Sequence, residues 1–141
     1  MAIKMRILYA ASGKMVTMAE KLRAEYGLES NKVDTIPPAY SCDKERIVFL
    51  GLSVKDEPDD SVRRFLGELN PTKAQNVALI MINSTEAGAK FVKDVLKQAG
   101  TNVYDDVLFV KGGILPFMKG IKPEEETALI EWSHKVVDSL K

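Results

Sequence analysis

The chain has few of the residues on which many active sites depend. Of its 141 residues, one is a cysteine, Cys42, and one is a histidine, His134. A single cysteine forms no disulfide within the chain, which favours a reducing compartment, so we expect a cytoplasmic protein. His134 lies on the last predicted helix, away from the loops that end the strands, so the sequence predicts no Ser–His–acid triad. No cluster of histidine, cysteine and aspartate has metal-ligand spacing, so we expect no metal site.

A surplus of charge and a long apolar run are missing as well. Twenty basic and twenty acidic residues give a formal net charge of zero at pH 7. Proteins that bind nucleic acids usually carry a basic surplus, so we expect no nucleic-acid partner. No apolar run approaches the roughly 18 to 20 residues of a membrane span, so we expect no membrane partner. Hydrophobic residues still make up 45% of the composition, which is enough for one buried core. The length predicts a single domain over residues 1–141.

Five short apolar runs indicate β-strands. They cover residues 6–11, 32–36, 46–52, 76–82 and 107–110. The first, third and fourth runs are apolar almost throughout, which is typical of strands buried on both faces of a parallel sheet. The second run is shorter and more polar, which favours an edge strand.

Helical periodicity follows most of these runs. The predicted helices cover residues 15–26, 62–69 with a start at 60 or 61, 91–99, and 123–140, the last with Glu124, Glu125 and Glu126 in its first turn. Residues 37–45 are too short and too rich in proline for a good helix, so they predict a single helical turn or an extended crossover. Alternating strands and helices predict an α/β fold, a doubly wound five-stranded parallel sheet in the flavodoxin-like order 2-1-3-4-5.

In that strand order, the loops after the first, third and fourth strands lie together. The first loop is the turn Ser12-Gly13-Lys14, which leads directly into a helix. Free backbone N–H groups and the positive end of the helix dipole favour an anion there, and the Ser12 hydroxyl and Lys14 ammonium add to a phosphate site. The alternative is a plain strand-to-helix turn, with Ser12 as the N-cap and Gly13 present for its backbone freedom.

The other two loops at this edge offer polar groups but no aromatic ring. Residues 52–60 include Leu52, Ser53 and Val54, followed by a charged stretch that either borders a ligand or caps the next helix. Residues 83–88 include Asn83, Ser84 and Thr85, which suit both a helix N-cap and a ligand contact. Beyond the last predicted strand, residues 112–118 (GGILPFM) either cover a ligand or a partner through Phe117, or fold back on the core.

At these loops the chain resembles the flavodoxin family. The segment ILYAASGKMVTMAEKL is similar to the family's opening strand, loop and helix. RIVFLGLSV followed by SVRRFLGEL resembles the third strand with its flavin-flanking loop, and DVLFVKGGI resembles the last strand and its glycine turn.

The resemblance implies noncovalently bound flavin mononucleotide (FMN) and electron transfer with a redox partner protein. The implied cofactor-binding residues are Ser12, Gly13, Lys14, Leu52, Ser53, Val54, Asn83, Ser84 and Thr85. The first loop has one hydroxyl before Thr17, and neither of the two loops that would flank the flavin ring has an aromatic side chain. These two features favour the alternative, a flavodoxin-like domain that has lost the flavin and serves as a binding or regulatory module.

Overall fold

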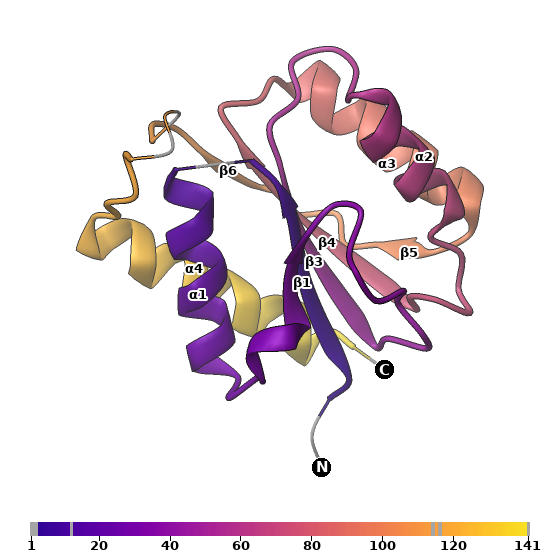
Figure 1. Ribbon diagram of the computed structural model, residues 1–141, viewed down its shortest axis with the longest axis horizontal. Coiled ribbons are helices and arrows are strands. Elements are labelled where there is room, and N and C mark those ends of the chain that lie inside the picture. Colours follow the sequence, from indigo (N-terminus) through magenta and orange to yellow (C-terminus); the bar gives the residue numbers. More distant parts are fainter. Residues whose placement is uncertain (1–2, 12, 114, 116, 141) are drawn as a thin grey trace.

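The computed structural model describes residues 3–11, 13–113, 115 and 117–140. Within them a single parallel sheet lies between two layers of helices (Figure 1). Its strands are β1 (Met5–Ala10), β2 (Val33–Thr35), β3 (Ile47–Leu52), β4 (Asn76–Ile82), β5 (Asn102–Val103) and β6 (Leu108–Val110). The order is β2-β1-β3-β4-β5, with β6 also paired to β4. The predicted α/β class, the strand order 2-1-3-4-5 and the edge position of β2 are confirmed.

The outer position beside β4 is shared by two short strands. β5 pairs with Asn76 and Val77 at the start of β4, and β6 pairs with residues 80–82 at its end. The sequence predicted one strand here, at residues 107–110. The structure shortens that strand to β6 and adds β5 before it. The Tyr104 amide still donates to the Val77 carbonyl of β4 at 2.9 Å, and the two short strands are separated by residues 104–107.

Helices cover both faces of the sheet, as a doubly wound fold requires. α1 (Lys14–Glu25) and α4 (Pro123–Asp138) pack on one face, and α2 (Asp60–Glu68) and α3 (Glu86–Ala99) pack on the other (Figure 1). Trp132 of α4 is buried against Phe49 of β3, and its Nε1 donates to the Asp106 carbonyl at 2.8 Å. None of the helices in the described ranges combines the length and hydrophobicity that a bilayer crossing needs.

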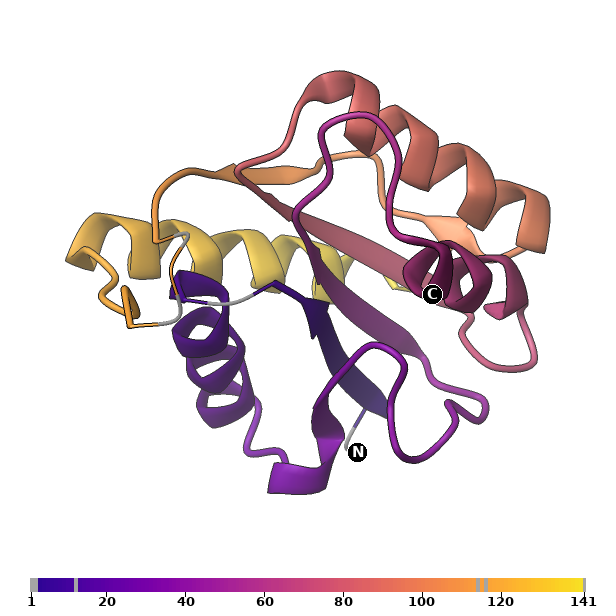
Figure 2. The same cartoon turned by 45° about the horizontal axis from the view of Figure 1, so that its top comes forward.

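The crossover between β2 and β3 contains no helical turn and bends several times between residues 36 and 46 (Figure 2). A short 3₁₀ helix, η1 (Ser30–Lys32), precedes β2. The crossover is fixed to the sheet by Arg6, whose Nη2 donates to the Tyr40 carbonyl at 2.6 Å. Cys42 fills the core beneath it, and burial raises the pKa of its thiol. The thiol is therefore a packing group in its protonated form.

Candidate functional site

The ends of β1, β3 and β4 bring the three predicted loops to one edge of the sheet. The strands are parallel, so their carboxyl ends meet at the same edge, and the loops that follow them are neighbours. Of the nine residues that the sequence assigned to a cofactor, eight are described there. Ser12 lies outside the described residues.

Two of these loops are hydrogen-bonded to each other. The Val54 amide donates to the Ser84 hydroxyl at 2.8 Å, and the Thr85 amide donates to the Val54 carbonyl at 3.2 Å. The Ser84 oxygen also lies 3.1 Å from the Ile82 carbonyl and 3.3 Å from the Leu52 carbonyl. The Ser84 hydroxyl, which the sequence predicted to contact a ligand, therefore lies within hydrogen-bond distance of backbone groups of both loops.

Thr85 is the N-cap of α3. Its Oγ1 accepts from the Gly88 amide at 3.0 Å and donates to the Lys55 carbonyl. A Cβ on Gly88 would lie 2.2 Å from the Val54 carbonyl oxygen, so glycine allows the first turn of α3 to rest on the neighbouring loop. The capping interpretation of this segment is confirmed, and capping uses the Thr85 hydroxyl.

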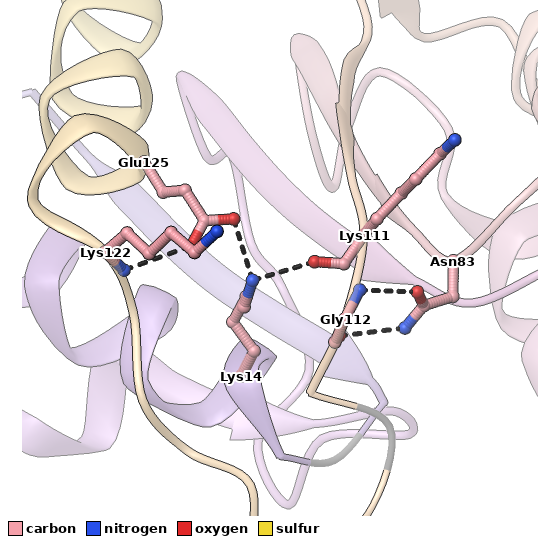
Figure 3. Close-up of polar contacts among 6 residues, drawn as sticks. All are labelled: Lys14, Asn83, Lys111, Gly112, Lys122 and Glu125. Carbon is pink, nitrogen blue, oxygen red and sulfur yellow. Dashed lines mark hydrogen bonds and ion pairs between the residues drawn. The ribbon is translucent and has the colours of Figure 1, made fainter.

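Asn83 joins the loop after β4 to the chain that follows β6 (Figure 3). Its Nδ2 donates to the Gly112 carbonyl at 3.0 Å, and its Oδ1 accepts from the Gly112 amide at 2.8 Å. The Asn83 amide itself donates to the Val110 carbonyl at 2.7 Å. Asn83 has φ of 51°, a left-handed conformation that asparagine tolerates better than most residues. The side chain thus fixes where the chain leaves the sheet.

The N-terminus of α1 meets a carbonyl oxygen of the chain itself. The Lys14 amide donates to the Gly113 carbonyl at 3.1 Å. Gly13 has φ of +67°, and a Cβ on it would lie 1.9 Å from the same oxygen. We call the described residues between β6 and α4, which are 111–113, 115 and 117–121, the closing segment. Its backbone lies where the sequence predicted an anion, and its partial negative charge satisfies the same helix end.

The Lys14 side chain is directed to α4 and not to open solvent (Figure 3). It is 7% exposed, and its Nζ lies 2.7 Å from the Glu125 Oε2 and 2.7 Å from the Lys111 carbonyl oxygen. The other Glu125 oxygen accepts from the Lys122 amide at 3.0 Å. The hydrogen bond from Lys14, and to a smaller extent the one from the Lys122 amide, holds the pKa of Glu125 below its ordinary value. Lys14 thus links the starts of α1 and α4.

Four of the eight described candidate residues line two separate hollows, and the other four line neither of them. Lys14 lines one of about 510 Å³ together with Met118, Ile121 and Glu125. Leu52, Ser53 and Val54 line a second hollow of about 70 Å³ on the other side of the edge. The sequence-based candidates lacked Glu125, Lys111 and Gly113, whose oxygens accept hydrogen bonds from Lys14. Glu125 is one of three consecutive acids that all suit a helix start, so nothing in the sequence distinguishes it from Glu124 and Glu126.

Comparison of the chain with models of known protein families, with curated proteins and with solved structures finds no significant match. The flavodoxin resemblance therefore stays a prediction, and the geometry of the edge is the basis for assigning a function.

We expect Gly13→Ala to destabilise the fold more than Gly27→Ala. Both glycines have positive φ. A Cβ on Gly27 would have no atom within 4 Å, whereas a Cβ on Gly13 would clash with the Gly113 carbonyl. The backbone conformation alone costs about 1 kcal/mol, and the clash adds about 1–3 kcal/mol. Urea unfolding of the two variants measures the difference. Equal losses would show that the closing segment does not rest on Gly13.

Glu125→Gln should destabilise the protein at neutral pH and have little effect in acid. Because the folded state lowers the pKa of Glu125, its contribution is full above the ordinary carboxyl pKa of 4.5 and is lost as the pH falls through the folded value. We expect a loss of about 1 kcal/mol at pH 7. Unfolding free energies measured from pH 7 to pH 3 test this.

Glu124→Gln is the matched control, since Glu124 lies in the same first turn of α4. A pH-independent difference between wild type and Glu125→Gln, or one equal to that of Glu124→Gln, would contradict a specific contact with Lys14.

Proposed function

We propose that the chain is a flavodoxin-like domain that serves as a binding or regulatory module, in which the chain's own residues fill the flavin phosphate position. The observation that carries this proposal is the hydrogen bond of 3.1 Å from the Lys14 amide to the Gly113 carbonyl. The helix end that would bind a phosphate oxygen already has an oxygen acceptor.

Electrostatics support the same proposal. The Lys14 ammonium is paired with the Glu125 carboxylate at 2.7 Å, so its charge is already neutralised. A phosphate placed here would face that carboxylate and the Gly113 carbonyl at short range, and like charges at such distances repel. Phosphate binding would therefore require both contacts to be broken first.

The region predicted for the flavin ring is also small. The hollow beside Leu52, Ser53 and Val54 has a volume of about 70 Å³, whereas small-molecule pockets usually have about 300–1,000 Å³. The hydroxyls of Ser84 and Thr85 are held by neighbouring backbone groups. A ring at this edge would have few free polar groups to orient it.

FMN-dependent electron transfer with a redox partner protein is the second candidate. Three loops converge at the carboxyl edge and a positive-φ glycine precedes α1, which is the arrangement that nucleotide sites of this strand order use. In this candidate, the closing segment moves away from Gly13, and Lys14 exchanges Glu125 for the phosphate. A cytoplasmic location and the absence of nucleic-acid and membrane partners stay predictions under both candidates.

A titration with FMN separates the two candidates. The binding-module proposal predicts that the fluorescence of FMN is not quenched and that the melting temperature of the protein stays constant up to high micromolar FMN. Glu125→Gln, which frees Lys14, is titrated in parallel. Saturable quenching together with a rise in melting temperature would contradict the proposal, because a ligand of the native state stabilises it by mass action. Tighter binding by Glu125→Gln would identify Lys14 as the phosphate ligand.

A further inference from the structure

The outer side of the closing segment is apolar and basic. Leu115, Phe117 and Met118 are 48%, 78% and 45% exposed, although each is a large apolar residue. Lys111 and Lys119 are exposed at the ends of this stretch, and residues 107–122 contain no acidic residue. Adjacent exposed apolar residues of this size are uncommon on an isolated domain and mark a contact surface.

A cluster of acidic residues lies at the same edge of the sheet. Residues 56–60 (DEPDD), which we call the acidic loop, follow β3 and carry four exposed acids and no base. Figure 1 shows the acidic loop and the closing segment beyond the same ends of the strands, with the start of α1 beside the closing segment. The hollow of about 70 Å³ lies next to the acidic loop. Val54, Pro58 and Val62 line it together with the acids Glu57 and Asp59.

We propose that this edge is the interface of a two-fold symmetric pair of copies of this chain. The closing segment of each copy contacts the acidic loop of the other, and one apolar side chain of the closing segment enters the hollow. Every copy carries both halves of the contact, so a single two-fold rotation forms it twice. This inference rests on the proposed function, in which the edge holds no flavin.

Charge complementarity favours a second copy over other occupants. An anionic lipid surface or a nucleic acid would attract Lys111 and Lys119 but repel the four acids of the acidic loop at the same edge. A second copy presents acids to the lysines and lysines to the acids. The neutral chain has no net charge that would oppose self-association.

Phe117 is the residue on which the contact should depend most. It is the most exposed of the large apolar side chains described, and buried aromatic residues dominate the energy of most protein interfaces. Lys111 and Lys119 hold the closing segment through their backbone carbonyls, which accept from Lys14 and Thr17. Their side chains can therefore be exchanged without removing those bonds.

Sedimentation equilibrium of the purified protein from about 1 μM to 1 mM tests the pair directly. We expect a monomer–dimer equilibrium that weakens as salt is added. Phe117→Ser should raise the dissociation constant about 30-fold, equivalent to about 2 kcal/mol. Tyr40→Ser is the matched control, since Tyr40 is a 69% exposed aromatic residue on the crossover, and it should leave the constant unchanged.

Charge exchange tests the two-fold arrangement. One variant carries Lys111→Glu and Lys119→Glu, and the other carries Asp56→Lys and Glu57→Lys. The first variant should stay monomeric because acidic residues then face acidic residues. The second should dimerise more weakly than wild type because its loop no longer carries a net negative charge, and an equimolar mixture should form a heterodimer. Lys90→Glu with Lys97→Glu on α3 changes the net charge equally and should still dimerise. Circular dichroism melts confirm that each variant is folded.

A monomer at every concentration would overturn the proposal, as would a dimer that Phe117→Ser and the charge exchanges leave intact. Failure of the mixture to associate would overturn the two-fold arrangement. Sedimentation of a monomer with vesicles of phosphatidylglycerol, and not with vesicles of phosphatidylcholine, would assign the closing segment to lipid instead. The FMN titration is independent of all these results. It tests whether the Gly113 carbonyl and Glu125 exclude a phosphate from the start of α1, and this does not depend on whether two copies associate.

Discussion

The hydrogen bond between the Lys14 amide and the Gly113 carbonyl determines the arrangement of the carboxyl edge. The first amides of a helix lack partners within the helix and need acceptors from elsewhere. In nucleotide-binding folds of this strand order, a bound phosphate is a common acceptor. Here the acceptor comes from the chain after β6, and Gly13 admits it because the residue has no side chain. The first amide of α1 is therefore satisfied without a ligand.

The apolar side chains of the closing segment are exposed because its backbone carbonyls are hydrogen-bonded to α1. Carbonyl groups of Lys111, Gly113 and Lys119 accept hydrogen bonds from α1, so the backbone faces inward. With the backbone on α1, the side chains of Leu115 and Phe117 extend to the outside. Exposed apolar area is unfavourable in water, and covering it supplies a driving force for association. The same contacts that occupy the predicted phosphate position thus leave these apolar side chains exposed.

The sequence predicted the fold well because the strongest signals are local. β1, β3 and β4 are continuous apolar runs, and the glycines after α1 and α3 end those helices. The sequence did not predict β5, because a strand of two residues is too short to show a periodic pattern. The candidate residues do lie at one edge, but their partners were not predictable. Lys14 and Glu125 are 111 positions apart, so no local pattern connects them. The sequence around Thr85 is the same whether its hydroxyl caps a helix or contacts a ligand, so sequence alone does not distinguish the two roles.

Hydrogen exchange at the Lys14 amide, followed by nuclear magnetic resonance, tests whether the chain itself closes the start of α1. We expect this amide to exchange far more slowly than an amide of an unfolded chain, although it lies at the first position of a helix, where amides usually exchange fast. The protection should be lost in Gly13→Ala, because the added Cβ displaces the Gly113 carbonyl. Fast exchange of the Lys14 amide in the wild-type protein would contradict a helix end closed by the chain itself.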